Sequence, residues 1–202
     1  MVESAPLPQG TKRYDPLKLK NFLSSILVTA GVTSVDAELV ADVLVGADLR
    51  GVRSHGAARL SYFIVRLEKG SLNLNADMKF IKHTHTTGLL NADDGIGIIA
   101  AGKAMDIAME MANDYGSGFV GVANSSHFGF AGYWAERAMR KGYIGISMSN
   151  SGGRTAPTYA RESMLGTNPM SVSMPGGDNT DFLLDMATTT VAVGKIETAL
   201  RE

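Results

Sequence analysis

Hydrophobic residues in the first 70 positions recur at intervals of three or four, the spacing of one face of an α-helix. The first stripe covers residues 19–30 and follows Asp15-Pro16, a typical N-cap with proline at the first helical position. Two further stripes cover residues 37–49 and 60–67, and each of the three is followed by a glycine, which often lies just past a helix C-terminus. The apolar positions are Leu19, Phe22, Leu23, Ile26, Leu27, Ala30, Ala37, Val40, Ala41, Leu44, Val45, Leu49, Leu60, Phe63, Ile64 and Leu67. The pattern predicts three amphipathic helices and no strand in this segment.

Beyond residue 75, short apolar runs alternate with helical stripes, which is typical of an α/β protein. Strands are expected over 78–86, 88–91, 119–123, 143–149, 171–174 and 182–185, and helices over 98–112, 131–141 and from 188 onward. The strand at 119–123, the helix at 131–141 and the strand at 143–149 predict one parallel β-α-β unit. We therefore divide the chain into a helical segment, residues 1–75, and an α/β part, residues 76–202.

The composition narrows the classes of protein to consider. Of the 202 residues 45% are hydrophobic and 19% charged, and the net charge of -1 offers no basic surplus for phosphates, so we expect no nucleic-acid partner. The absence of cysteine excludes a disulfide scaffold and a thiolate zinc site. No run approaches the ~18 apolar residues of a membrane span, and the N-terminus lacks the basic and apolar regions of a signal peptide. We expect a cytoplasmic protein without a membrane partner.

Two segments carry a histidine in a setting that suits catalysis. Asn124 to Gly132 contains His127 and follows a predicted strand, where α/β proteins commonly place their sites. Arg53 to Arg59 contains His55, and if its helix begins near Ser54, then His55 and Arg59 share one face. A guanidinium binds a carboxylate through two parallel hydrogen bonds, and a histidine can exchange a proton beside it. The alternative is a polar turn and a capped helix start with solvated side chains.

The segment Gly95 to Ala100 matches the pattern G-x-G-x-x-G/A of dinucleotide-binding proteins. Asp93 and Asp94 place negative charge where a pyrophosphate would bind, which argues against that function. The acidic residue expected about 20 positions later is Asp114, at the end of the following helix instead of a second strand. We interpret the segment as a tight turn between a strand and a helix, with a Rossmann-type binder as the weaker alternative.

Three further segments carry polar side chains of weaker significance. Asn150 to Arg154 follows a strand and offers backbone N–H groups and a cation, and Asp185 to Thr190 begins a hydroxyl-rich helix start. Both types of segment can bind phosphate or carboxylate, and both also occur as ordinary loops and caps. His83-Thr84-His85 has the spacing of two metal ligands on one strand face, but it lacks a third nearby ligand, so we predict no metal site.

Several of these segments together resemble the malate/L-lactate dehydrogenase family that does not use the Rossmann fold. That family also includes ureidoglycolate, sulfolactate and 2,3-diketo-L-gulonate oxidoreductases. The resemblance covers the chain from about Asp15 to its end, and its motifs occur in the order of the family. The matching residues are Arg53-Ser54-His55-Gly56, Ser125-Ser126-His127-Phe128-Gly129 with Ala131-Gly132-Tyr133, Asn150-Ser151, Leu165-Gly166-Thr167-Asn168-Pro169, and Asp185-Met186-Ala187-Thr188 with Gly194-Lys195.

The resemblance implies a fold and a reaction. The fold would be a three-layer α/β/α mixed sheet of the L-sulfolactate dehydrogenase-like type, preceded by the N-terminal helical segment. Residues 1–75 would contribute to the substrate domain, and residues 76–202 would form the cofactor-binding domain. The protein would be an NAD- or NADP-dependent oxidoreductase acting on a small 2-oxo or 2-hydroxy carboxylate. Malate would be the first candidate substrate, with ureidoglycolate, lactate or another 2-hydroxy acid as alternatives, and the enzyme would be a homodimer.

The resemblance also assigns roles to residues of this sequence. His127 would be a proton acceptor, His55 is the proton donor proposed in some members, and Ser54 would polarise or orient the substrate. Arg59 would bind the substrate carboxylate. The residues that would contact the cofactor are Ser151, Asp185, Met186 and Ala187.

The family resemblance further implies that members continue well beyond the position that matches Glu202. The chain would then lack part of the cofactor-binding domain. This observation leaves a second hypothesis open, a truncated non-catalytic family member or interaction fragment. The sequence does not decide between NAD and NADP or between the two histidines as the proton carrier.

Overall fold

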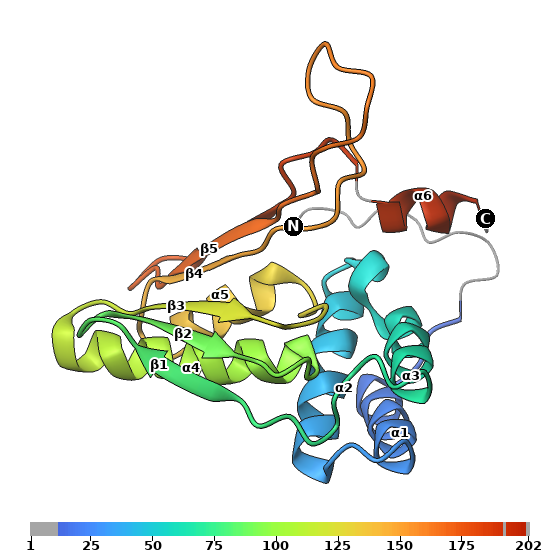
Figure 1. The fold of residues 1–202 in the computed structure, drawn as a ribbon, viewed down its shortest axis with the longest axis horizontal. Coiled ribbons are helices and arrows are strands. Elements are labelled where there is room, and N and C mark those ends of the chain that lie inside the picture. The colour runs from blue at the N-terminus through green and yellow to red at the C-terminus, as the bar shows by residue number, and fades with distance from the viewer. Residues whose placement is uncertain (1–11, 192, 201–202) are drawn as a thin grey trace.

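Three helices form the N-terminal part of the computed structural model, which describes residues 12–191 and 193–200. They are α1 (Pro16–Thr29), α2 (Ser34–Leu49) and α3 (Leu60–Glu68) (Figure 1). The side chains of Asp15 and Thr33 accept hydrogen bonds from the first turns of α1 and α2, as expected of N-caps. The three predicted helices are confirmed, but two residues of their apolar stripes, Phe22 and Leu49, are exposed.

The segment between α2 and α3 differs from the prediction. Two short 3₁₀ turns, η1 (Arg53–His55) and η2 (Ala57–Arg59), precede α3, so His55 and Arg59 do not lie on one face of an α-helix. Gly56 separates the two turns in an extended conformation. A Cβ at Gly56 would lie 1.8 Å from a carboxylate oxygen of Asp48, which also accepts a hydrogen bond of 2.8 Å from the Ala57 N–H. Asp48 therefore fixes the break between the two turns.

The first sheet contains β1 (Lys79–Lys82), β2 (Thr87–Asn91) and β3 (Phe119–Ala123), in that spatial order. β1 pairs with β2 antiparallel, whereas β2 pairs with β3 parallel, so this sheet is mixed. The 19-residue helix α4 (Gly97–Tyr115) connects the two parallel strands and packs against β3. β1 is shorter than predicted because the chain turns after Lys82, where the His83 N–H donates to the Thr87 carbonyl.

The second sheet contains β4 (Gly145–Met148), β5 (Met170–Met174) and β6 (Phe182–Met186) and is antiparallel throughout. Helix α5 (Ala131–Met139) packs on β4 and β5, and α6 (Val193–Ala199) follows β6. The predicted parallel unit of β3, α5 and β4 is wrong, because these strands lie in different sheets and the parallel pair is β2 and β3. In β4, Gly145 and Ser147 are buried and Ile146 and Met148 exposed, a one-sided pattern typical of antiparallel sheets.

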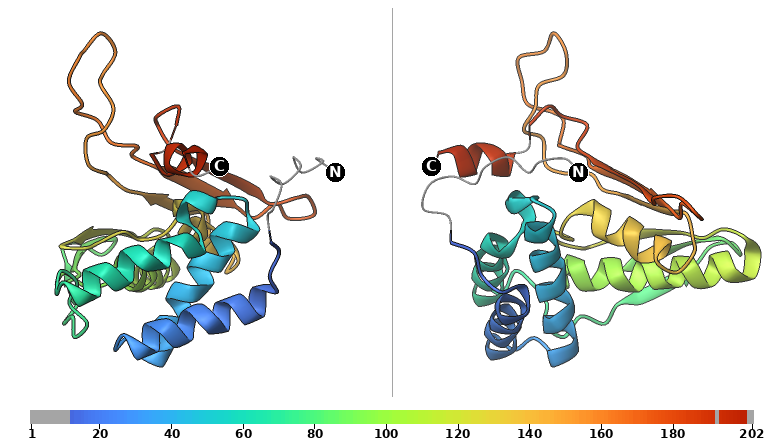
Figure 2. Two further views of the ribbon diagram at one scale, coloured as in Figure 1. Left: turned by 90° about the vertical axis from the view of Figure 1, so that its right-hand side faces the viewer. Right: turned by 180° about the vertical axis from the view of Figure 1, so that it is seen from behind.

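The main hydrophobic core lies where the N-terminal helices meet the starts of α4 and α5. Its largest members include Phe63, Ile98 and Trp134, and all three are almost fully buried. A smaller cluster fills the space between the first sheet and α4. The loop between β4 and β5 extends away from the rest of the chain (Figures 1 and 2). Within residues 12–191 and 193–200, no helix is both long and apolar enough to cross a membrane.

Candidate active site

The structure brings together the two histidines that the sequence placed 72 positions apart. The ring centroids of His55 and His127 are 5.3 Å apart, with an angle of 31° between the ring planes. His55 lies in η1, and His127 lies in the turn between β3 and α5. Tyr62 of α3 approaches His127 edge-on, with 5.8 Å between ring centroids. The imidazoles of His55 and His127 and the phenol of Tyr62 therefore form one compact group from three separate segments, the histidine cluster.

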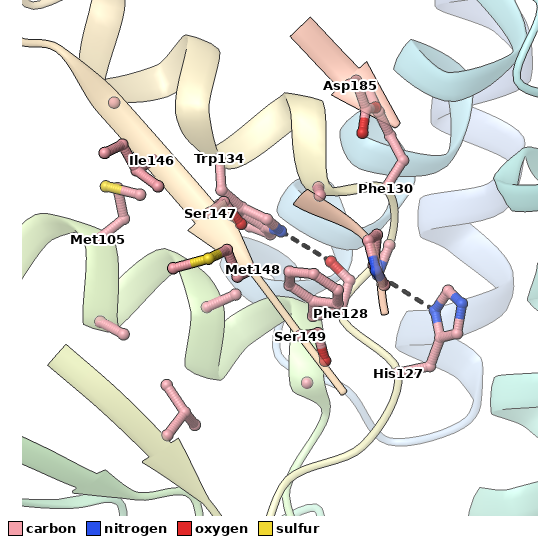
Figure 3. A pocket seen from close by; sticks show the side chains of 18 of the residues that line it. Met105, His127, Phe128, Phe130, Trp134, Ile146, Ser147, Met148, Ser149 and Asp185 are labelled. Carbon is pink, nitrogen blue, oxygen red and sulfur yellow. Dashed lines mark hydrogen bonds between the residues drawn. The ribbon is translucent and has the colours of Figure 1, made fainter. Parts of the chain in front are cut away.

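The turn that carries His127 is held from both sides. The Ser126 hydroxyl accepts a hydrogen bond of 2.8 Å from the Gly97 N–H and donates one of 3.2 Å to the Gly95 carbonyl. On the other side, the indole N–H of Trp134 donates to the Phe128 carbonyl at 2.8 Å, as Figure 3 shows. Ser126 therefore occupies the N-terminus of α4. The glycine pattern that resembles a dinucleotide fingerprint binds the turn that contains His127.

A substitution at Gly97 distinguishes this structural function from cofactor binding. A Cβ at this position would lie 2.1 Å from the Ser126 carbonyl oxygen, a backbone atom that no rotamer change can move. Gly97→Ala is therefore expected to lower the free energy of unfolding by about 1–3 kcal/mol, measured by urea unfolding. Gly51→Ala is less suitable as a control because Gly51 has a positive φ, so Gly152→Ala, where a Cβ meets nothing within 4 Å, is preferred. Lost cofactor binding with unchanged stability would instead favour the Rossmann-type alternative.

Burial and nearby positive charge lower the pKa of both histidines. The pKa of His127 falls to about 4 because of burial first, and then because of the nearby His55 and Arg59. The pKa of His55 is also lowered, again by burial first and then by Arg59. Perturbed pKa values of this kind are common where side chains take part in catalysis.

Ser54 and Arg59 hold the segment around His55 in place. The Ser54 hydroxyl lies 2.9 Å from Nδ1 of His55, and Nε of Arg59 donates to the Ser54 carbonyl at 2.6 Å. A Cβ at Gly194 of α6 would lie 2.7 Å from Cβ of Ser54 and 2.9 Å from Nη2 of Arg59, so α6 packs directly on this segment. Arg59 therefore lies between η1 and α6, with its charge near both imidazoles.

A cavity of about 2020 Å³ adjoins the histidine cluster and extends between β3 and β4. Arg59 is not one of its lining residues. Arg53, Tyr62 and Arg66 do line it, although no function was predicted for any of them from the sequence. Tyr62 and Arg66 are four positions apart on one predicted helix, and this polar pair was the signal that could have identified them. The predicted site residues that line the cavity are Ser54, His55, His127, Ser151, Asp185, Met186 and Ala187.

Ser151 joins two loops at the far end of this cavity. Its hydroxyl accepts a hydrogen bond of 2.8 Å from the Thr167 N–H, and its N–H donates to the side chain of Asn168 at 3.0 Å. The Thr188 N–H in turn donates to the Thr167 carbonyl at 2.9 Å. Three segments that the sequence treated as separate motifs, at Ser151, Thr167 and Thr188, are therefore linked directly.

Asp185 has a structural partner in addition to its place at the cavity. Its carboxylate accepts a hydrogen bond from the Gly132 N–H at the start of α5, a helix whose N-cap residue provides no side-chain bond. Burial raises the pKa of Asp185, whereas this hydrogen bond and the charge of Arg50 lower it. Asp185 thus joins β6 to the N-terminus of α5 (Figure 3), where a negative charge is favourable.

The possible metal ligands at His83 and His85 lie away from the histidine cluster. Both side chains are exposed, and the His85 ring lies against Tyr115 with 4.9 Å between centroids. Within the part of the chain that the structure describes, no three histidine, cysteine or acidic side chains are grouped to hold a metal ion.

Comparison with known proteins shows the chain to be similar to dehydrogenases. Residues 14–202 match the family described as malate/L-lactate dehydrogenase. The chain is 41% identical over 202 residues to a malate dehydrogenase of Pyrococcus abyssi, covering 100% of this chain and 56% of the relative. It is 40% identical over 187 residues to an L-sulfolactate dehydrogenase of Methanocaldococcus jannaschii, covering 93% of this chain and 54% of the relative.

A solved structure agrees with these relatives. The malate dehydrogenase of Pyrococcus horikoshii OT3 superposes with a TM-score of 0.93 at 40% identity, covering 98% of this chain and 56% of that chain. The predicted α/β fold of the L-sulfolactate dehydrogenase-like type is confirmed by structural neighbours of this kind. The chain spans about half the length of the relatives that it matches. Over that length, it belongs to the malate/L-lactate dehydrogenase family.

Proposed function

We propose that the chain forms part of an NAD(P)-dependent oxidoreductase that interconverts a small 2-oxo carboxylate and its 2-hydroxy acid, malate being the first candidate. The observation that carries the proposal is the pair of imidazoles 5.3 Å apart beside a large cavity, with the charge of Arg59 acting on both. The names of the similar proteins support this reaction class, and sulfolactate, lactate and ureidoglycolate are alternative substrates.

The residues at the cavity fit a nicotinamide dinucleotide. Pockets for drug-sized ligands measure about 300–1,000 Å³, so a cavity of about 2020 Å³ has room for both a dinucleotide and a small acid. Lys195 and the hydroxyls of Thr189 and Thr190 line it and suit a pyrophosphate. The cofactor, NAD or NADP, would contact Ser151 and a second group formed by Asp185, Met186 and Ala187.

The side chains of this chain would bind the substrate and handle its proton. When bound, the reduced nicotinamide supplies a hydride to the carbonyl carbon. Arg59, whose charge acts on both imidazoles although its side chain does not line the cavity, would hold the substrate carboxylate and so fix which carbonyl face is presented. Ser54 and the imidazoles of His55 and His127 surround the carbonyl oxygen, where negative charge develops. One well-placed proton donor is typically worth about 10²–10⁴-fold in rate.

Arginine substitutions test where the carboxylate binds. Arg59→Ala is expected to raise KM for the 2-oxo acid by about 10–100-fold, because a hydrogen bond to a charged group contributes roughly 1.5–3 kcal/mol. Arg53→Ala is the matched comparison, since Arg53 lines the cavity and Arg59 does not. A larger rise in KM for Arg53→Ala than for Arg59→Ala would indicate that Arg53, and not Arg59, binds the substrate carboxylate.

Binding and turnover test the proposal as a whole. NADH and NADPH are titrated into the protein while their fluorescence and the melting temperature are followed, since a ligand that binds only the folded state raises that temperature. Oxaloacetate, pyruvate, sulfopyruvate and oxalurate are then compared as substrates. Oxidation of the cofactor by at least one of these acids is expected. The absence of both cofactor binding and turnover would favour the second hypothesis, a non-catalytic family member.

We also propose two features of the whole protein. The first is the division of labour between residues 1–75, for the substrate, and residues 76–202, for the cofactor. The second is a homodimer in the cytoplasm. Gel filtration with light scattering measures the oligomeric state directly.

A further inference from the structure

The hydrogen bonding of His127 determines which of its ring nitrogens carries the proton. The Gly129 N–H donates to Nδ1 of His127 at 3.1 Å (Figure 3). A backbone N–H can only donate, so Nδ1 must present a lone pair to it. In a neutral imidazole, the other nitrogen then carries the hydrogen atom. This contact therefore selects the tautomer of His127 with its proton on Nε2.

Gly129 cannot easily turn its N–H away from the ring. Its φ of +86° lies in the left-handed region, and a Cβ at this position would be 2.4 Å from Cγ1 of Val43, which is fully buried. The preceding carbonyl, of Phe128, is held by the indole N–H of Trp134 at 2.8 Å. Backbone that is fixed on both sides keeps the donor pointed at the ring, so the tautomer of His127 is part of the folded structure.

The surroundings of His127 also oppose its protonation. A second proton on Nδ1 would face the Gly129 N–H and end this hydrogen bond. The titratable groups packed against His127 are His55 from η1, Arg59 from η2 and Tyr62 from α3, whose hydroxyl accepts a hydrogen bond from Arg66. None of these groups is acidic, and both His55 and Arg59 disfavour a positive charge on the ring.

We propose that His127 acts as a fixed, neutral hydrogen-bond donor through Nε2 to the substrate's carbonyl oxygen, and that it does not carry the transferred proton. The proposal rests on the proposed function for the identity of that oxygen. It differs from the expectation that His127 accepts the proton, since Nε2 in this tautomer has no free lone pair. Gly129 is accordingly a positioning residue, because it sets the tautomer without touching the substrate.

His55 is then the imidazole that exchanges the proton. Its Nδ1 lies 2.9 Å from the Ser54 hydroxyl, which leaves Nε2 for the substrate. In reduction, the hydride forms the new C–H bond and the π-electron pair of the carbonyl moves to oxygen. The oxygen takes the proton from Nε2 of the His55 imidazolium, which becomes neutral. His127 keeps its proton throughout, and oxidation of the hydroxy acid reverses each step.

Nitrogen NMR of the protein labelled with ¹⁵N-histidine tests the tautomer without relying on activity. The chain contains four histidines, and His→Gln variants assign each one. His127 is expected to show a protonated Nε2, an unprotonated Nδ1, and nitrogen shifts that stay constant between about pH 5 and 8. A protonated Nδ1, or titration of His127 within this range, would overturn the proposal.

The pH dependence of turnover provides the second readout. His127→Gln replaces the imidazole donor by an amide N–H donor and leaves His55 in place. Its kcat should therefore fall, while the midpoint of the kcat–pH profile stays within about 0.3 units of that of the unaltered protein. His55→Gln should remove that midpoint. Loss of the midpoint in His127→Gln alone would contradict the proposal. If the tautomer is as expected but no 2-oxo acid is reduced, the proposed function fails and the assignment of the ring proton stands.

Discussion

His55→Ala is expected to lower kcat for reduction of a 2-oxo acid by about 10²–10⁴-fold, because the developing alkoxide loses its proton donor. His127→Ala is expected to lower kcat by about 10²–10³-fold, the cost typical of removing one hydrogen-bond donor to such an oxygen. KM for the 2-oxo acid should change less than kcat, since both interactions strengthen as charge develops on the oxygen. The measurement is steady-state oxidation of NADH or NADPH at saturating acid.

The matched control is His83→Ala. This histidine is exposed in the turn after β1, and the contact between the rings of His55 and His127 does not involve it. Its replacement should leave kcat within about twofold, as expected of a surface substitution away from the site. Unchanged kcat in both His55→Ala and His127→Ala would show that the imidazole pair does not serve this reaction.

Trp134→Ala is expected to destabilise the fold more than any other substitution considered above. The side chain is only 1% exposed, and truncation of a buried Trp or Phe to Ala typically costs about 3–5 kcal/mol. The change also removes the donor to the Phe128 carbonyl. At roughly 2–4 °C per kcal/mol for a chain of this size, the melting temperature should fall by about 6–20 °C, measured by circular dichroism.

Two further variants separate the contributions of Trp134. Trp134→Phe keeps an aromatic ring but loses the indole N–H, so it should cost less than alanine while still weakening the hold on Phe128. Val35→Ala is the surface control, since Val35 is 79% exposed on α2, and it should stay within about 0.5 kcal/mol. A loss below about 1 kcal/mol for Trp134→Ala would contradict the assigned place of Trp134 in the core.

Local patterns predicted most elements because they depend on neighbouring residues. The caps at Asp15 and Thr33 and the stripes that bury Leu23 and Leu44 follow from helix geometry alone. Strand pairing did not follow, because an apolar run specifies a strand but not its partner, and β4 pairs with β5 instead of belonging with β3. The break at Gly56 was missed for a similar reason, since it depends on the Asp48 carboxylate of another helix.

The histidine cluster could be anticipated only in part. The sequence predicted that His127 follows a strand and that His55 precedes a helix, and the family resemblance assigned both to one active site. The spacing of the residues along the chain did not predict the distance of 5.3 Å between their ring centroids. Tyr62 was not predicted as a site residue because it is adjacent to Phe63, whose apolar side chain identifies α3 as a helix that packs on the core. The tautomer of His127 depends on one backbone N–H two residues away, which no pattern of residue types encodes.

Transfer of deuterium provides the most direct test of the reaction proposed for this site. Nicotinamide cofactor carrying deuterium at the transferable C4 position is incubated with the protein and oxaloacetate, and the product is analysed by mass spectrometry. Malate with one deuterium at carbon 2 is expected from the unaltered protein, and none above background from the variant with alanine at both His55 and His127. Absence of labelled 2-hydroxy acid from the unaltered protein with every acid tested would contradict the proposed hydride transfer. Equal labelling by the double variant would contradict the role of His55 and His127 in that reaction.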